Sequence, residues 1–347
     1  MENWKKKLAD SITSPDQLSD RFGSDVSPLA KVVARYPMRI TPHYFSLIRE
    51  QGDPIWRQCV PDPEELADGN QLEDPLDEEN LSPVPGLIHR YPDRAVLLVS
   101  NACAVYCRFC MRKRHVGCRS SDAGRVSIGD ALRYIAETPA IRDVIISGGD
   151  PLLLEDDRLE QVLCRLRAIP HVEIIRIGTR IPVTLPERVT VRLCRMLKRY
   201  QPLFINTHFN HPLEITAESR RACSMLADAG IPLGNQTVLL RGVNDDPCTM
   251  TRLMQQLLTI RVRPYYIHQM DLVRGTRHFR TTVALGIGIM EALRGHTSGM
   301  ANPHYVIDLP GGKGKVQIVP DCVRRKEGKL LLTNYLGEIV EYEDVGE

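Results

Sequence analysis

Three cysteines lie close together in a pattern typical of ligands to a shared metal centre. Cys103, Cys107 and Cys110 have the spacing C-x3-C-x2-C. The apolar residues 95–99 come shortly before them and predict a buried strand, so we expect the cysteines on a loop at the C-terminal end of that strand. Cationic neighbours help to keep thiols deprotonated. The cations interleaved with this cysteine triad are Arg108, Arg112, Lys113 and Arg114.

Three thiolates favour an iron–sulfur cluster over a single zinc ion. They suit a [4Fe–4S] cluster with one iron left open, whereas most such clusters have four cysteine ligands. Structural zinc takes four ligands, usually from two paired C-x2-C units. The remaining cysteines of the chain show no paired spacing. The triad therefore predicts a cluster, with a structural zinc site or three unrelated thiols as the alternatives.

The composition argues against several classes of protein. The chain has 347 residues and a formal net charge of +2, which allows one large catalytic domain or two modest ones and argues against nucleic acid as a main partner. The first residues lack the apolar segment of a signal peptide. No apolar run approaches the roughly 18 residues needed to span a membrane. We therefore expect a cytoplasmic protein with free thiols and no membrane partner.

Strand and helix patterns alternate after the cysteines. Six strand–helix units can be counted between residues 95 and 294, which predicts parallel strands with helices outside them. Six units are fewer than the eight of a closed barrel, so a partial barrel and a flat doubly wound sheet both fit. The expected organisation is a mostly helical accessory region over residues 1–81, the α/β domain over residues 82–300, and a C-terminal segment with a β-rich tail over residues 301–347.

Polar residues and glycines gather where these strands are expected to end, which is where parallel α/β folds place their sites. Glycine permits close approach of the backbone to a ligand, although an ordinary turn explains SGGD equally well. Two histidines without a carboxylate pattern are more often hydrogen-bonded than metal-bound. The candidates are Ser147, Gly148, Gly149 and Asp150 after the second strand, His208 and His211 after the fourth, and Gln236 at the fifth.

Two further segments could bind ligands, one of them a phosphate and the other an aldehyde. Arg90, Tyr91 and Arg94 are candidate phosphate contacts because guanidinium groups match phosphate oxygens, with ordinary surface arginines as the alternative. The segment PGGKGK at residues 310–315 offers a lysine amine beside closely approaching backbone, which suits a Schiff base. Its spacing differs from the G-x4-G-K-[ST] of a phosphate-binding P-loop.

Three charged residues are ambiguous when they are taken alone. Asp271 and Asp308 each follow or end an apolar run, and either could be a helix cap or a loop residue. Together they could hold a buried cation, which needs paired anions. Arg112 could bind a substrate carboxylate, or it could be a surface cation that compensates the thiolates.

These motifs resemble those of the lysine 2,3-aminomutase family of radical S-adenosylmethionine enzymes. The resemblance extends from about residue 40 to residue 342 and rests on the cysteine triad, on HRYPDR at residues 89–94, on SGGD at residues 147–150 and on the glycine-rich lysine segment. It implies a partial (β/α)6 radical-SAM barrel. It also implies three cofactors, namely a [4Fe–4S] cluster, S-adenosylmethionine and pyridoxal 5′-phosphate.

The resemblance assigns a role to each candidate residue. The triad holds the cluster, and Lys315 is the Schiff-base lysine because, aligned on Pro310, Lys313 replaces one of the family's glycines. The implied contacts are SGGD, His208 and Gln236 to S-adenosylmethionine, Arg90, Tyr91 and Arg94 to the phosphate of pyridoxal phosphate, Arg112 to the substrate carboxylate, and Asp271 and Asp308 to the substrate ε-ammonium.

The expected activity is the conversion of L-lysine to β-lysine by radical amino migration. The alternatives are the same chemistry serving β-lysylation of elongation factor P, another amino acid such as arginine, and a non-catalytic zinc- or cluster-binding scaffold. Expected partners are an electron donor such as flavodoxin or ferredoxin and further copies of the chain. The family's C-terminal zinc-binding cysteines are not matched, since only Cys322 stands late in the chain, and His268 replaces a common aromatic residue.

Overall fold

One curled sheet of nine strands carries most of the predicted site residues. The computed structural model describes residues 2–23, 26–67, 71–117, 128–326 and 329–343. Strands β1 to β9 lie side by side in sequence order. Strands β2 to β8 run parallel, and β1 and β9 pair antiparallel at the two edges. The strands are β1 Leu87–Tyr91, β2 Arg94–Ser100, β3 Asp143–Gly148, β4 Ile174–Gly178, β5 Leu203–Thr207, β6 Leu233–Leu239, β7 Arg263–Gln269, β8 His304–Asp308 and β9 Lys315–Gln317.

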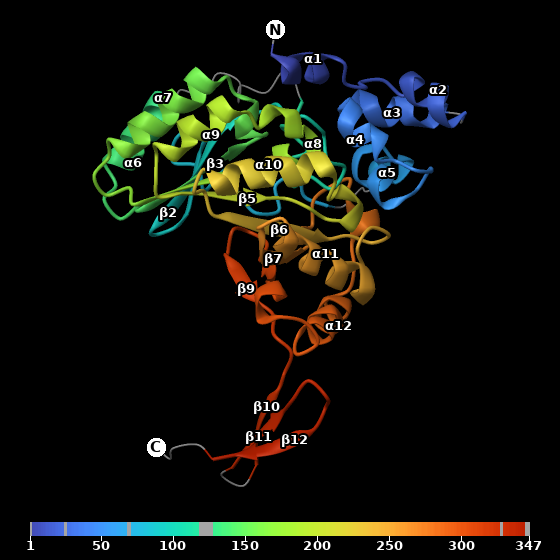
Figure 1. Ribbon diagram of the computed structural model, residues 1–347, viewed down its shortest axis with the longest axis vertical. Coiled ribbons are helices and arrows are strands. Elements are labelled where there is room, and N and C mark those ends of the chain that lie inside the picture. Colours follow the sequence, from blue (N-terminus) through green and yellow to red (C-terminus); the bar gives the residue numbers. More distant parts are fainter. Residues whose placement is uncertain (1, 24–25, 68–70, 118–127, 327–328, 344–347) are drawn as a thin grey trace.

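A helix follows each of the strands β2 to β7, so the predicted (β/α)6 partial barrel is confirmed (Figure 1). A doubly wound sheet reverses its strand order at a switch point, whereas here the order never reverses. Strand β8 adds one more parallel strand beyond the six counted units. The helices are α6 Ile128–Ala136, α7 Asp156–Arg167, α9 Val191–Lys198, α10 Ala217–Asp228, α11 Pro247–Thr259 and α12 Val283–Leu293, with the short α8 Ile181–Thr184 before α9.

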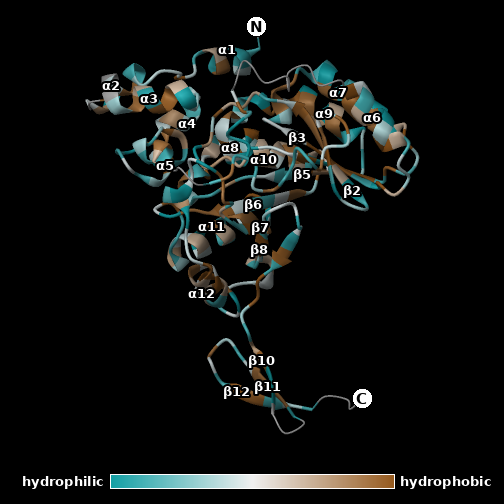
Figure 2. Ribbon diagram, turned by 180° about the vertical axis from the view of Figure 1, so that it is seen from behind, coloured by the Kyte–Doolittle hydropathy of each residue, from teal (hydrophilic) through white to brown (hydrophobic). Residues whose placement is uncertain are grey.

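Hydrophobic periodicity explains these elements. Helix α7 buries Leu159, Val162, Leu163 and Leu166, which recur at helical spacing and form one face. Strand β2 alternates buried and half-buried residues, as a strand with two different faces does. Figure 2 shows hydrophobic residues both on the strands and on the helices that cover them. The core therefore lies between the sheet and its outer helices.

The N-terminal region packs onto the barrel. Many of its buried residues, among them Trp4, Tyr44 and Ile55, belong to the same hydrophobic cluster as the barrel core. The Thr41 hydroxyl donates to the Thr184 carbonyl at 2.5 Å. The elements of this region are α1 Asn3–Ala9, α2 Asp16–Phe22, α3 Ser27–Arg35, α4 Pro42–Ser46, α5 Pro54–Cys59 and the 3-10 helix η1 Pro63–Leu66.

The C-terminal tail forms a second, smaller sheet. Strands β10 Val323–Lys326, β11 Lys329–Thr333 and β12 Ile339–Tyr342 pair antiparallel and extend away from the barrel (Figure 1). The tail contacts the barrel where the ring of Tyr335 lies against Gly295. Among the described residues, no helix is both long enough and apolar enough to cross a membrane.

Candidate active site

The cysteine triad lies on the loop after β2, where the sequence predicts it. The N-terminal region holds this loop through backbone hydrogen bonds, with Tyr106 N donating to Arg39 O at 3.0 Å and Arg108 N donating to Gln58 O at 2.9 Å. These contacts join residues that are far apart in the chain. The accessory region is therefore part of the support of the cysteine loop.

The cations of the cysteine loop bind carboxylates, and they do not determine the pKa of the Cys110 thiol. Arg108 Nη2 and Lys113 Nζ each lie 2.5 Å from the Glu65 carboxylate, which is fully buried in η1. Burial raises the pKa of Cys110 to about 11 and outweighs the attraction of Arg112 and Lys113. Arg112 and Lys113 do lower the pKa of Cys110, as expected, but their effect is smaller than that of burial. Metal binding itself must remove that proton.

The glycines of SGGD pack against the backbone of the cysteine loop. A Cβ added at Gly148 would lie 2.3 Å from Ser100 O, and one added at Gly149 would lie 2.3 Å from Ala102 O. Asp150 N donates to the same Ala102 carbonyl at 2.8 Å. The glycines are thus needed for the approach of β3 to the loop, a reason that the sequence pattern does not reveal.

Asp150 ties this turn to the segment after β4. Its buried carboxylate accepts hydrogen bonds from Thr179 Oγ1 at 2.7 Å, from Arg180 N at 2.7 Å and from Leu152 N at 3.1 Å. Burial raises the pKa of Asp150, and these donors oppose the rise. Asp150 therefore organises two neighbouring strand ends of the barrel.

The three thiols of the triad suit an iron–sulfur cluster. All three cysteines are free thiols. Within the part of the chain that the structure describes, no three His, Cys, Asp or Glu side chains are placed to hold one metal ion. A cluster takes each cysteine on a different iron, which spaces the sulfurs more widely than a single zinc ion does.

Asp308 and Lys315 lie directly opposite each other in the hairpin of β8 and β9. Lys315 Nζ lies 2.7 and 2.8 Å from the two carboxylate oxygens of Asp308. Arg90 Nη1 approaches the same carboxylate at 3.2 Å, and His268 Nδ1 approaches it at 3.3 Å. Three predicted or noted residues from three separate segments therefore meet at the carboxylate of Asp308.

The two aspartates of the predicted ammonium site differ in their pKa. Burial favours the neutral form of Asp308, but the hydrogen bond from His268 and the charge of Lys315 hold its pKa well below the usual range. Burial, followed by the nearby charge of Asp308, raises the pKa of Asp271 to about 7. Asp271 follows β7 by two residues and lies in the field of Asp308. The pair thus has one stable anion and one carboxyl that titrates near neutrality.

The residues expected to hold pyridoxal phosphate lie together and fit an anion. Arg90 Nε is buried and finds no hydrogen-bond partner among the described residues, so a donor is available there. The Tyr91 hydroxyl accepts from Lys315 N at 2.9 Å, and the Arg94 guanidinium lies 4.1 Å from the centre of the Tyr91 ring. A Cβ at Gly314, where φ is +90°, would approach the Tyr91 hydroxyl to 3.3 Å. This combination of lysine, arginines and glycine suits a phosphorylated aldehyde.

Arg112 points toward the SGGD turn. Its guanidinium binds Glu78 through Nε at 3.0 Å and Nη2 at 2.7 Å, and Nη1 lies 3.3 Å from Ser147 Oγ. Arg112 is thereby oriented from one side by a buried carboxylate. Sequence reasoning missed Glu78, which lies in an acidic stretch without a recognisable pattern.

The histidines after β5 take part in local hydrogen bonds. His208 Nε2 lies 3.1 Å from Asn210 Oδ1, and its ring centre is 5.5 Å from that of Phe109 on the cysteine loop. His211 Nδ1 accepts from Leu213 N at 3.1 Å. His208 therefore lies next to the cysteine loop. Gln236 lies in β6 opposite Tyr266 of β7.

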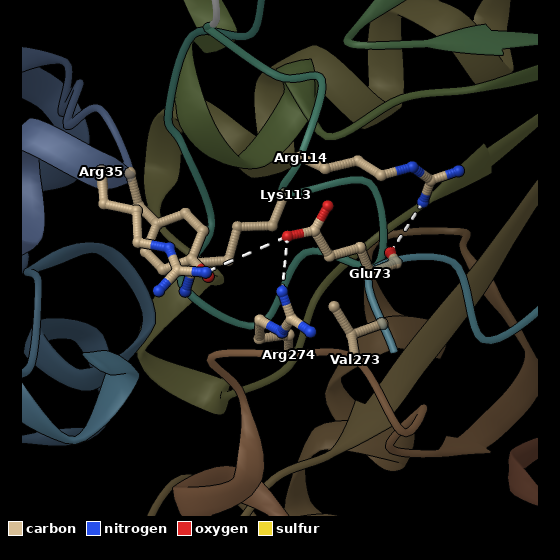
Figure 3. Close-up of a pocket in the computed structure, with 7 residues that line it drawn as sticks. Arg35, Glu73, Lys113, Arg114, Val273 and Arg274 are labelled. Atoms are coloured by element: carbon tan, nitrogen blue, oxygen red, sulfur yellow. Dashed lines mark hydrogen bonds and ion pairs between the residues drawn. The ribbon is translucent and has the colours of Figure 1, made fainter. Parts of the chain in front are cut away.

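A cavity of about 210 Å³ lies on another side of the cysteine loop (Figure 3). It is lined by Lys113 and Arg114 of the loop together with Arg35, Glu73 and Arg274. Glu73 lies between two of the guanidiniums, at 2.7 Å from Arg274 and 3.9 Å from Arg35. None of the predicted cofactor or substrate residues lines this cavity, so it is not the candidate active site.

A partial barrel with this cysteine loop defines a class of enzyme. The family model described as the radical SAM superfamily matches residues 97–254, and the chain is a radical S-adenosylmethionine enzyme. The model described as lysine-2,3-aminomutase matches residues 290–347. Together with the relatives described next, these matches show that the chain belongs to the lysine 2,3-aminomutase family, whose members are isomerases.

The relatives cover nearly the whole chain. L-lysine 2,3-aminomutase from Fusobacterium nucleatum is 49% identical over 98% of this chain and 82% of its own length. The enzyme of the same name from Acetoanaerobium sticklandii is 53% identical over 99% of this chain and 84% of its own. Glutamate 2,3-aminomutase from Clostridioides difficile is 45% identical over 99% of this chain and 82% of its own. Overall sequence identity therefore does not distinguish lysine from glutamate as the substrate. The residues of the site have to make that distinction.

Proposed function

We propose that this protein moves the α-amino group of L-lysine to the β-carbon and forms β-lysine. The observation that carries the proposal is the ion pair of Lys315 Nζ with Asp308, at 2.7 and 2.8 Å. The site already holds one lysine ammonium, and Asp271 adds a second carboxyl beside it. A buried cation needs paired anions, so the same two groups suit the ε-ammonium of a bound lysine.

The charges of the site argue against glutamate as the substrate. A glutamate side chain would bring its carboxylate toward Asp308, which stays ionised because its pKa is lowered. Two like charges at short distance in a desolvated site repel strongly. Lysine meets an anion at the same place. The proposal therefore follows the two relatives named L-lysine 2,3-aminomutase and not the one named for glutamate.

We assign the chain's residues to roles that follow their positions. Cys103, Cys107 and Cys110 hold the cluster, and Arg112, oriented by Glu78, binds the substrate carboxylate. Lys315 binds pyridoxal phosphate covalently, with Arg90, Tyr91 and Arg94 near its phosphate. Ser147 to Asp150, His208 and Gln236 border S-adenosylmethionine. When bound, these cofactors supply a carbon-centred radical and the conjugated system that stabilises it during amino migration.

The hairpin geometry favours Lys315 over Lys313 as the cofactor lysine. Lys315 is the first residue of β9 and faces Asp308 across the hairpin. Lys313 lies in the turn between Gly312 and Gly314, which have φ of +69° and +90°. The amine of Lys315 is therefore the one directed to the predicted ammonium site.

The test is an anaerobic assay of the reconstituted full chain. We expect β-lysine from L-lysine by chromatography and mass spectrometry after addition of iron, sulfide, pyridoxal phosphate, S-adenosylmethionine and dithionite. Arginine and glutamate serve as parallel substrates. Cys107→Ala and Lys315→Ala should abolish the product, while Lys313→Ala should keep it. Formation of 5′-deoxyadenosine with unchanged lysine would contradict the substrate, and its absence from a cluster-loaded protein would contradict the reaction class.

We further propose that the electron comes from a small protein such as flavodoxin or ferredoxin. The cluster needs a one-electron reductant, and dithionite replaces that donor in the assay. Product formation with reduced flavodoxin in place of dithionite tests the proposal. No β-lysine with either flavodoxin or ferredoxin, in a preparation that is active with dithionite, would contradict it.

A further inference from the structure

The guanidinium of Arg180 reaches a triad cysteine from outside the cysteine loop. Its Nη1 donates a hydrogen bond to the Sγ of Cys107 at 2.9 Å, across 73 positions of the chain. Arg180 follows β4 and is only 8% exposed. A buried arginine aimed at a thiol differs from the loop's own cations, which bind carboxylates.

The other nitrogens of Arg180 fix the direction of Nη1. Its Nε donates to the His208 carbonyl at 3.2 Å. Its Nη2 lies 2.6 Å from Gln58 Oε1 and 2.6 Å from Glu214 Oε1. Because the five N–H groups of an arginine form a rigid fork, partners for Nε and Nη2 leave Nη1 directed at the sulfur.

Aromatic rings and a buried counter-ion complete this environment. The guanidinium lies 5.3 Å from the centre of the Phe109 ring on the cysteine loop. Glu214 is 0% exposed, and its carboxylate also accepts from the Tyr44 hydroxyl at 2.7 Å. Glu214 neutralises the charge of Arg180. The main effect of Arg180 on Cys107 is therefore the directed N–H hydrogen bond and not a net positive charge.

We propose that Arg180 is a positioning residue that holds the Cys107 thiolate of the bound cluster and raises the cluster's reduction potential. The inference rests on the proposed function, because it requires a cluster on the triad. Hydrogen bonds to ligand sulfurs are among the features that set the potential of iron–sulfur clusters. Reduction adds negative charge to these sulfurs, so an N–H donor stabilises the reduced form more than the oxidised form.

The test uses the reconstituted full chain in three variants. Removal of Arg180 alone would leave Glu214 buried without its counter-ion, so the main variant is Arg180→Met combined with Glu214→Gln. Arg180→Lys keeps the positive charge but loses the planar set of N–H donors of the guanidinium. Arg188→Met is the matched control, because Arg188 is 1% exposed and binds Leu152 O and Asp156. Iron, acid-labile sulfide and thermal unfolding are measured first, and the potential is then titrated with electron paramagnetic resonance.

The double variant should carry a full cluster that is harder to reduce. At a fixed potential we expect the ratio of reduced to oxidised cluster to fall about tenfold, or ~59 mV for a one-electron couple. Arg180→Lys should shift in the same direction, and Arg188→Met should keep the wild-type potential. Wild-type potential in Arg180→Lys and in the double variant would overturn the inference, as would an equal shift in Arg188→Met. If the double variant does not fold, the reduction potential of Arg180→Lys alone tests the inference. Wild-type protein that binds no sulfide would instead refute the proposed cluster.

Discussion

At the scale of single residues, the site is arranged around the carboxylate of Asp308. Lys315, Arg90 and His268 all approach it within 3.3 Å. Lys315, which we assign to the cofactor, thus forms an ion pair with Asp308, which we assign to the substrate ammonium. Because one carboxylate cannot pair closely with two ammonium groups at once without repulsion between them, attachment of Lys315 to its cofactor would release Asp308 for the substrate.

Replacement of Lys315 by alanine tests the assignment of the cofactor lysine. We expect Lys315→Ala to lose covalent labelling by pyridoxal phosphate after borohydride reduction, because the only amine facing Asp308 in the β8–β9 hairpin is removed. Lys313→Ala is the matched control from the same turn and should be labelled as the wild type is. Peptide mass spectrometry identifies the labelled residue. A label that survives in Lys315→Ala and disappears in Lys313→Ala would reverse the assignment.

The raised pKa of Asp271 predicts a pH dependence of lysine binding. Below its pKa of about 7 the carboxyl is protonated and loses its attraction for an ammonium. The apparent Kd of lysine for the cofactor-loaded protein should rise about tenfold for each pH unit below this value and level off above it. Stability changes in the opposite direction, because a pKa raised on folding means that this group's stabilisation is lost as the pH rises through about 7.

Calorimetric titration of lysine across neutral pH is the measurement. Asp271→Asn cannot ionise, so its weaker binding should not vary with pH in this range. A profile in Asp271→Asn with the same slope as in the wild type would assign the titration to another group.

At the scale of secondary-structure elements, the cysteine loop is held between the SGGD turn and the N-terminal region. Gly149→Ala tests the first contact. The added Cβ would lie 2.3 Å from the Ala102 carbonyl, which is backbone and cannot move aside easily. We expect a loss of about 1–3 kcal/mol of stability and a lower iron content after reconstitution. Gly288→Ala in α12 meets nothing within 4 Å and should lower neither stability nor iron content. Full stability and full iron content in Gly149→Ala would contradict the role of this contact.

Glu65→Gln tests the contact with the N-terminal region. Glu65 binds both Arg108 and Lys113 at 2.5 Å, and all three side chains are buried. Loss of one partner leaves buried charges uncompensated, so the free energy of unfolding should fall by about 3–5 kcal/mol in denaturant titrations. Glu173→Gln removes an exposed ion pair with Arg142 and should change stability by no more than about 0.5 kcal/mol. Equal effects of the two substitutions would show that the buried cluster is not holding the loop.

At the scale of the whole molecule, local sequence motifs predict the site residues at the strand ends. Contacts between residues that are far apart in the sequence could not be predicted. The cysteine triad, SGGD and the β8–β9 hairpin are each formed by one short stretch of sequence. Their placement therefore follows from the alternation of strands and helices. Arg180 and Cys107 are 73 positions apart, and Arg108 and Glu65 are 43 apart. These pairs depend on how the barrel curls and on where the N-terminal helices pack, which hydrophobic periodicity does not determine.

One face of the C-terminal sheet is mostly apolar, with Arg325 as its charged residue, and we expect copies of the chain to associate through it. Val323, Leu332 and Val340 are direct cross-strand neighbours, and Leu330 pairs with Tyr342 in the next row of the same face. Val323, Val340 and Tyr342 are more than half exposed. An exposed apolar face of this kind marks a protein interaction site, and a second copy of the chain would cover it with matching chemistry.

Light scattering after size exclusion tests this association. Val340→Lys combined with Tyr342→Lys places charges on the apolar face, and the molar mass should fall toward that of one chain, 39.2 kDa. Glu341→Gln is the control, because Glu341 lies between these residues on the opposite face and pairs with Lys329. The control should keep the wild-type mass. A wild-type mass of one chain, or an unchanged mass in the double variant, would contradict an interface on this sheet. Because the substituted residues lie in β12, outside the barrel, the barrel should fold and bind its cluster equally well in all of these proteins.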